Sequence, residues 1–388
     1  MFYGYFNKFN FVNTAFGLRK PFNLNKNNGK CKRKLWSVLW AILFIVSTTL
    51  CYFYFVNFND YLDLKQNLPD VGGTNNLIVN VLIIILELFN NDDPFVQVYK
   101  IICNMFDKLK LDDIDKKMLS YKLQLWIVFI STIFITLIIA EFVYDYPPYE
   151  IVFNIPVFLT MVHLVIHLCL LLAFLKTINL RLKQSLHFDN KELVVQQNTF
   201  SEQPAARKRF ISYLFNMRIS FLDNNVEYTD IKTLCHLYDD VITCVRLLEI
   251  NHGTQAFLII WLMFSGAIMG ITMIMVTEKI LPWLVVAKTV QLFLWYFLGC
   301  YVNESMGKEV EQTELLVIKY LIHFKRDQPI RNLLGTFQQL VSTNRVQFTA
   351  CNLFSLNYSN ILGTIVSVIT YSIILNQLFW SGQNLEKS

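Results

Sequence analysis

Several apolar segments of this chain are long enough to cross a lipid bilayer, and no other feature constrains its fold as strongly. Of the 388 residues, 54% are hydrophobic and only 16% are charged, whereas soluble domains carry about 25% charged residues. The run from Leu123 to Val143 by itself approaches the ~20 residues that a helix needs to span the hydrocarbon core. A soluble enzyme built around one large core is therefore excluded.

The apolar runs predict an all-α polytopic membrane protein with seven transmembrane helices. The expected spans are 35–56, 74–92, 123–143, 151–175, 254–277, 282–303 and 354–379. The second is the weakest, because its apolar core from Leu77 to Phe89 is short. Pro94, which follows two Asp residues, predicts the start of a new cytosolic helix. No cleavable signal peptide is visible in the basic first 34 residues.

Lysine and arginine residues alternate along the chain in a way that predicts its orientation. Eight lie in the N-terminus, six in 93–122, ten in 176–253 and six in 304–353. The loops on the other side carry one such residue or none, and Lys288 is the one basic residue inside a span. Basic segments stay in the cytoplasm, so we expect a cytosolic N-terminus and an extracellular C-terminus. Topology also accounts for the net charge of +5, and we expect no nucleic-acid partner.

Five of the eight cysteines fall in segments that are expected to be cytosolic, so no disulfide framework is predicted. The cytosolic segments also show helical periodicity. In 176–253 the apolar positions recur every three or four residues and predict helices that continue the fourth and fifth spans: Leu234, Leu237, Val241 and Leu248. Segment 304–353 is expected to be helical on both sides of Pro329, with Leu315, Ile318 and Ile322 on one side.

The last span carries a stripe of small and polar residues. At helical spacing one face holds Asn360, Gly363, Ser367, Thr370, Ile374, Gln377 and Ser381. Such a stripe is costly in hydrocarbon unless it faces protein or water, so both helix packing and pore lining are open interpretations. Gly266 and Gly270 in the fifth span have the spacing of helix packing alone. We expect Ile374 to contribute to a hydrophobic gate and Gln377 to form a polar ring just outside it.

The same span carries a family motif. Thr370 and Tyr371, followed after five residues by Gln377, resemble the C-terminal signature of the insect gustatory receptors. The stretch from Phe348 to Tyr358 is similar to the segment that enters the last span in that family. The match covers roughly 30 residues, and four positions depart from it: Ser372 and Asn376 are polar where apolar residues are usual, Leu378 replaces Phe, and Asn352 replaces Gly.

The resemblance implies a tastant-gated, non-selective cation channel in the plasma membrane of chemosensory cells. It implies a homo- or hetero-tetramer of related receptors, with Ser367, Thr370, Ile374 and Gln377 along the pore and Tyr371 and Leu378 in helix packing. The resulting parts of the chain are a cytosolic basic N-terminus (1–34), helices 1–4 (35–175), a cytosolic helical extension and loop (176–253), helices 5–6 (254–303), a cytosolic anchor helix for assembly (304–353), the pore helix (354–379) and an extracellular tail (380–388).

A ligand pocket in such a receptor is expected among the outer halves of spans three to six. Pockets combine apolar walls with a few polar groups, and the candidate contacts are Glu141, Thr160, His163, Thr272, Trp283, Lys288 and Gln291. Glu141 and Lys288 are the strongest of these, because ionisable residues inside a membrane are expensive and usually functional. We expect these two side chains to pair.

Other classes of function have less support in the sequence. We expect no enzyme activity, cofactor or metal site, since His163 and His167 lack a matching carboxylate or cysteine pair and no phosphate-binding loop is present. An insect odorant receptor channel is the nearest alternative. A G-protein-coupled receptor requires the opposite orientation, and a transporter would show internal repeats, of which there is no sign. The tastant itself is left open among sugars, bitter compounds and carbon dioxide, with a weak preference for bitter.

Overall fold

Long helices make up nearly all of the chain that the structure, a computed structural model, describes. The described residues are 64–89, 92–109, 148–185, 231–276, 281–323, 328–344 and 346–386, with isolated helical positions between 42 and 50 and between 132 and 139. The helices are α3 (Leu64–Phe89), α4 (Asp92–Lys108), α6 (Pro148–Ser185), α9 (Ile231–Val276), α10 (Leu281–His323), α11 (Gln328–Thr343) and α12 (Tyr358–Glu386). Two short strands, β1 (Thr349–Ala350) and β2 (Phe354–Ser355), precede α12.

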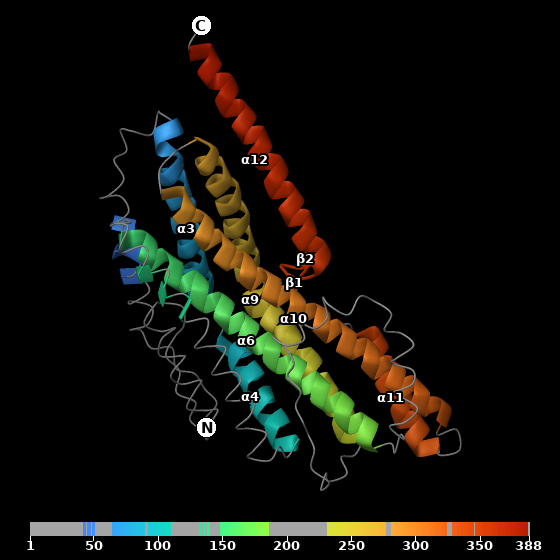
Figure 1. Cartoon of the computed structure of the whole chain (residues 1–388). Helices are drawn as coiled ribbons and strands as arrows, with labels where there is room; N and C mark the ends of the chain where they lie inside the picture. Colours follow the sequence, from blue (N-terminus) through green and yellow to red (C-terminus); the bar gives the residue numbers. More distant parts are fainter. Residues whose placement is uncertain are drawn as a thin grey trace.

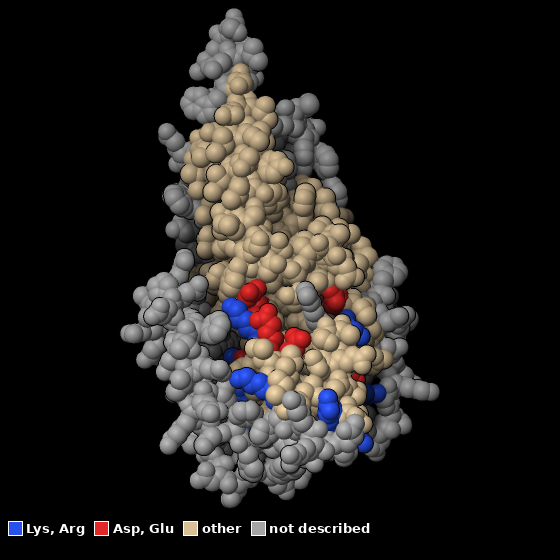
Figure 2. Space-filling model, turned by 90° about the vertical axis from the view of Figure 1, so that its right-hand side faces the viewer, with Lys and Arg blue, Asp and Glu red and all other residues tan. Residues whose placement is uncertain are grey.

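Three helices are much longer than a bilayer requires. The 46 residues of α9 extend roughly 69 Å at about 1.5 Å per residue, against a hydrocarbon core of about 30 Å. With α6, α10 and α12, α9 is long and apolar enough to cross a membrane. Each long helix has an uncharged part, 151–175 in α6 and 250–276 in α9, next to a charged part. In Figure 2 the described residues in the upper part of the visible face are uncharged, and the described charged side chains gather lower down.

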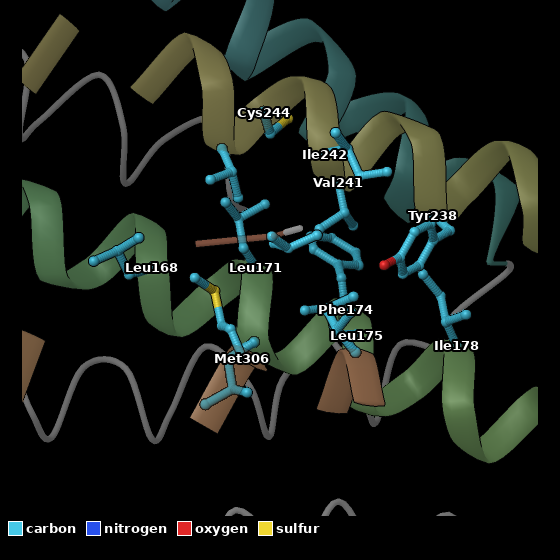
Figure 3. Packing of buried hydrophobic residues seen from close by; sticks show 14 of the residues in the cluster. Leu168, Leu171, Phe174, Leu175, Ile178, Tyr238, Val241, Ile242, Cys244 and Met306 are labelled. Atoms are coloured by element: carbon cyan, nitrogen blue, oxygen red, sulfur yellow. The ribbon is translucent and has the colours of Figure 1, made fainter. Parts of the chain in front are cut away.

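The charged half of the bundle has its own apolar core. Figure 3 shows Leu171 and Phe174 of α6 gathered with Val241 of α9 and Met306 of α10, and all four side chains are buried. The amphipathic helix α4 covers this core from another side with Val98, Ile102 and Met105, and Lys108 forms an ion pair with Asp240 of α9 at 2.8 Å. The predicted helical continuation of spans four and five into the segment 176–253 is confirmed, because α6 runs to Ser185 and α9 starts at Ile231.

Helix α9 is the central element of the described structure. It contacts α3, α4, α6, α10, α11, α12 and β1 (Figure 1). In the uncharged half, a second apolar cluster joins Ile83 of α3, Phe158 of α6, Leu262 of α9 and Trp295 of α10. Phe158 and Trp295 meet edge to face, with ring centroids 6.0 Å apart.

Glycines let α10 approach α9 closely, as their spacing predicts. A Cβ on Gly270 would lie 3.1 Å from Val286, and one on Gly266 would lie 3.2 Å from the Thr289 hydroxyl. Neither position has room for a larger side chain without a shift of α10. The interpretation of these two glycines as helix-packing residues therefore agrees with the structure.

Two boundaries differ from the sequence-based expectation. The last helix begins at Tyr358 rather than at 354, because residues 349–355 pair as a hairpin in which Thr349 lies opposite Ser355. Helix α3 begins at Leu64, ten residues before the expected second span, and α4 begins at Asp92 as Pro94 predicts. The N-terminus 1–34, most of the spans 35–56 and 123–143, and the loop 189–204 lie outside the described residues.

Candidate functional site

Among the described residues, the last helix is covered on only one side. In Figure 1 α12 rises from the hairpin and leans away from the other helices, and its contacts are with α9 and α10. Ile361, Val368 and Ser372 form its buried face. Large apolar residues around the rest of the helix are exposed: Leu362, Val366, Ile369, Ile373, Ile374 and Leu378. A helix of this composition requires lipid or other protein on its open sides.

The predicted pore residues lie mostly on the open side of α12. Thr370, Ile374 and Gln377 are exposed and Ser367 is half-buried, while nothing lies within 4 Å of a Cβ placed on Gly363. The Thr370 hydroxyl donates to the Val366 carbonyl at 2.9 Å, so it needs no partner from another element. The stripe is thus available to a neighbouring subunit or to water.

The signature residues Tyr371 and Leu378 lie differently. Tyr371 is half-exposed but its ring meets Phe264 of α9 edge to face, with centroids 6.0 Å apart. The expected packing role of Tyr371 stays a prediction. Leu378 is 63% exposed, and its expected packing role stays a prediction.

The two polar departures from the signature weaken the contact between α12 and the bundle. Ser372 is only 1% exposed, yet its hydroxyl has no hydrogen-bond partner among the described residues. The Asn376 side-chain oxygen, one turn further on, is also buried without a partner in that part of the chain. An unsatisfied buried polar group costs about 1–3 kcal/mol. The packed position of α12 is therefore held less tightly than apolar residues at these sites would hold it.

A short hairpin fixes the base of α12. Asn357 caps the helix by accepting a hydrogen bond from the Asn360 backbone N–H at 2.9 Å, and its own amide donates to the Ser355 hydroxyl at 3.0 Å. The Asn360 amide donates to the Ser355 carbonyl. Helical spacing places Asn360 on the polar stripe, but in the structure its hydrogen bonds stabilise the start of α12. The turn between the strands holds Cys351 and Asn352 at φ 55° and 56°, where Asn is better tolerated than Cys.

Replacing Cys351 with Gly is expected to stabilise the protein. A left-handed backbone is strained for Cys and free for Gly, so the gain should be about 0.5–1 kcal/mol, or roughly 2 °C in the melting midpoint. The measurement is thermal unfolding of the purified protein in detergent. Cys351→Ala removes the same thiol but keeps the strained φ, and should give no gain. Equal midpoints for the two variants would contradict this explanation.

A group of amide side chains occupies the uncharged half of the bundle. Asn75 donates to the Ser265 hydroxyl of α9 at 2.7 Å, and Asn76 donates to the Asn154 side-chain oxygen of α6 at 3.3 Å. Asn80 donates to the Asn76 side-chain oxygen at 2.8 Å, while its own carbonyl oxygen is buried with no partner among the described residues. These residues were absent from the candidate ligand contacts. Their occurrence inside an apolar span was a signal that could have found them.

The candidate His163 takes part in a buried chain of hydrogen bonds. Its Nδ1 lies 3.1 Å from Nε2 of His252, whose Nδ1 lies 2.7 Å from the Gln255 side-chain oxygen. Because an amide oxygen only accepts, Nδ1 of His252 carries the proton, and in the neutral ring its Nε2 accepts from His163. The Nδ1 of His167 lies 2.8 Å from the His163 carbonyl oxygen. His163 therefore links α6 to α9 in this structure.

The remaining ligand candidates are spread over three helices. Thr160 and Thr272 are buried, and Thr272 donates to the Ile268 carbonyl of its own helix at 2.7 Å. Lys288 and Gln291 are half-buried on α10. Glu141 and the Trp283 side chain lie outside the described residues, so the expected pairing of Glu141 with Lys288 stays a prediction. Among the described residues, no group of His, Cys, Asp and Glu is arranged to hold a metal ion.

Comparison with known proteins identifies the family. Residues 12–378 match a family model described as 7tm Chemosensory receptor. The chain belongs to this family. Chemosensory receptors of this kind are not enzymes, in agreement with the sequence-based expectation. No curated protein sequence matches this chemosensory receptor.

Solved structures share the fold of this chemosensory receptor. It is similar to the insect olfactory receptor OR5 from Machilis hrabei, with a TM-score of 0.67 and 13% identity over 97% of this chain and 98% of that one. The same olfactory receptor in complex with eugenol gives a TM-score of 0.65 at 12% identity, with the same coverage. The likeness extends over nearly the whole of both chains, so the all-α, seven-helix architecture is confirmed.

Proposed function

We propose that this chemosensory receptor is a gustatory receptor subunit that forms a tastant-gated, non-selective cation channel in the plasma membrane of chemosensory cells. The observation that carries the proposal is the last helix, which has the Thr370, Tyr371 and Gln377 signature and an uncovered polar stripe. Four copies of α12 around an axis would cover this stripe and enclose a water-filled path. Non-helical or polar surfaces at membrane depth are tolerated where they line such a path.

The alternation of basic segments supports a cytosolic N-terminus and an extracellular C-terminus. In this orientation Gln377 lies near the outer mouth of the pore and the hairpin lies at the cytosolic boundary. Ile374 is the large apolar residue between Thr370 and Gln377 on the stripe. Four Ile374 side chains would narrow the path and exclude water while the channel is closed.

Exposed apolar residues beyond the membrane support assembly through the charged half of the subunit. Leu315 and Ile322 of α10 are 61% and 62% exposed, and Ile318 between them is half-buried. They lie in a segment that also carries Lys308, Glu311 and Lys319. Because charges place this segment outside the hydrocarbon core, lipid cannot cover these side chains. A second receptor subunit, of the same or a related sequence, is the occupant that fits.

The uncharged half of the bundle is the proposed site of the tastant. Intramembrane polar residues are costly and are retained mainly at functional sites. Helices α3 and α6 contribute amides there, and α9 contributes the Ser265 hydroxyl. Asn80 offers a buried carbonyl oxygen that a ligand hydroxyl or N–H could satisfy. Thr160, His163, Thr272, Trp283, Lys288 and Gln291 remain candidate contacts, together with Glu141.

Pairing of Glu141 with Lys288 is testable by a double-mutant cycle. Glu141→Gln and Lys288→Met are each expected to shift the half-activating tastant concentration roughly fivefold, because each leaves the other charge unpaired in a low-dielectric region. The double variant should shift it no further than either single one. Concentration–response curves measure all four channels, and additive shifts would refute the pairing.

One experiment tests the proposed function. The chain is expressed alone and with related receptors, and whole-cell currents are recorded during application of sucrose, caffeine and eugenol. A cation current that persists when G-protein signalling is blocked supports a ligand-gated channel. A response that requires G proteins would contradict it. Activation by volatile compounds alone would favour an odorant receptor, the second candidate, whose fold the receptor shares at low sequence identity.

A further inference from the structure

A single buried side chain fastens both ends of the hairpin to α10. The Asn303 amide nitrogen donates to the carbonyl oxygens of Phe348 at 3.2 Å and Leu356 at 2.9 Å, and its side-chain oxygen accepts from the Phe348 backbone N–H at 2.8 Å. Phe348 precedes β1 and Leu356 follows β2. Asn303 is only 2% exposed. Its amide hydrogens and its oxygen are therefore all committed to the backbone of the hairpin.

The opposite side of the hairpin rests on α9 at a glycine. A Cβ on Gly253 would lie 3.2 Å from the Cys351 backbone nitrogen and 3.4 Å from the Thr349 carbonyl oxygen. Backbone atoms cannot move aside as a flexible side chain can. The hairpin is thus held between Asn303 of α10 and the bare backbone of α9, at the boundary between the uncharged and charged halves.

The residues that Asn303 contacts are joined to the first turn of α12 by a short hydrogen-bonded segment. Leu356, which Asn303 holds, is followed by the capping residue Asn357, and Asn360 reaches back to the Ser355 carbonyl. The hairpin and the first turn are therefore one hydrogen-bonded unit. Helix α10 runs without interruption from the proposed tastant region at Lys288 and Gln291 to Asn303. A displacement of α10 relative to α9 must move the base of α12.

We propose that Asn303 is a positioning residue that transmits the movement of α10 to the pore-lining helix α12, with Gly253 as the support on α9. This inference rests on the proposed channel function. It assigns a role in gating to a residue that contacts neither the ligand nor the pore. The generic alternative is that Asn303 only stabilises the fold. A role in transmitting movement and a role in stability alone predict different results. Only the first predicts altered gating in channels that are correctly folded and inserted.

The test compares variants of Asn303 with a variant of another buried asparagine that contacts α10 at a different place. Asn303→Ala removes all three hydrogen bonds, and Asn303→Asp keeps the shape but sets a carboxylate oxygen against two carbonyls. Asn179→Ala is the matched control, because Asn179 is equally buried and binds Glu309 and Thr313 of α10 far from the hairpin. Whichever of sucrose, caffeine and eugenol activates the wild type most strongly serves as agonist. Surface biotinylation normalises the currents.

Both Asn303 variants are expected to raise the half-activating concentration about tenfold and to lower the maximal current, with single-channel conductance and reversal potential unchanged. Asn179→Ala should change the half-activating concentration by less than about twofold. Gly253→Ala, which disturbs the same hairpin from α9 by only a few tenths of an ångström, should also raise it. This variant keeps the inference testable if the Asn303 variants fail to reach the surface.

Unchanged activation in surface-expressed Asn303 and Gly253 variants would overturn the inference, and so would an equal shift from Asn179→Ala. A change in single-channel conductance would instead assign Asn303 to the conduction path and would also overturn it. A wild-type receptor that gives no agonist current in any subunit combination contradicts the proposed function itself. The two failures are therefore distinguishable.

Discussion

Channels that carry Ile374→Ser are expected to conduct without tastant. The side chain lies 44% exposed on the open side of α12, between the polar residues Thr370 and Gln377. Replacing it with a hydroxyl in each subunit would allow water to fill the narrowest part of the proposed pore, because hydrophobic constrictions close by dewetting. Agonist-free current should rise roughly tenfold at equal surface density. Whole-cell recording with surface biotinylation provides the measurement.

The neighbouring residue provides a matched control for this prediction. Ile373 has the same side chain and is also exposed, but it lies about 100° around the helix from Ile374. Ile373→Ser should leave the agonist-free current close to that of the wild type. If both variants leak equally, the effect is a general loosening of α12. If neither leaks while both reach the surface, Ile374 is not part of the gate.

Loss of assembly is the second large effect that we expect. The double variant Leu315→Glu and Ile322→Glu places two charges on the exposed apolar side of α10 in each subunit. Burying these carboxylates in a subunit contact is costly without a paired base. The proposed tetramer should dissociate to smaller species, and tastant-evoked current should fall by more than about tenfold. Native gel electrophoresis and light scattering of the detergent-solubilised receptor report the oligomeric state.

The control for assembly is Lys308→Glu, which introduces the same residue at an exposed position of the same helix. It should preserve both the oligomer and the current. A double variant that remains tetrameric would show that another surface of the subunit holds the assembly together. Dissociation by Lys308→Glu as well would indicate that charge balance, rather than apolar contact, governs assembly.

Much of the fold could be predicted from the sequence because membrane insertion imposes simple rules. Apolar length and periodicity identified the long helices, and the recurrence of Leu234, Leu237 and Val241 identified the buried face of α9 below the membrane. The hairpin before α12 was not predicted. It consists of two-residue strands, and the residue before β1 is hydrogen-bonded to Asn303, 45 residues earlier in the chain. No local pattern encodes such a contact.

The candidate site was predicted only where its residues lie on one helix. The stripe on α12 could be found because helical spacing alone places Thr370, Ile374 and Gln377 together. His163 is expected among the ligand contacts, and its contact with His252, which lies on a distant helix, could not be predicted. The amides of Asn76 and Asn80 were missed because they belong to the second span, whereas the ligand pocket was expected among spans three to six. Which polar residues face each other across helices depends on helix rotation, which periodicity does not fix.

The uninterrupted course of α9 has a consequence for receptors of mixed composition. One continuous helix touches α3 in the uncharged half and α4 and α11 in the charged half. In the proposed oligomer, contacts that a neighbouring subunit makes with the charged half would therefore affect the helix that lines the proposed tastant region. By thermodynamic reciprocity, any partner that alters tastant affinity must itself be bound more or less tightly when the tastant is present. The choice of co-expressed subunit would thus tune sensitivity without any change in the residues that contact the tastant.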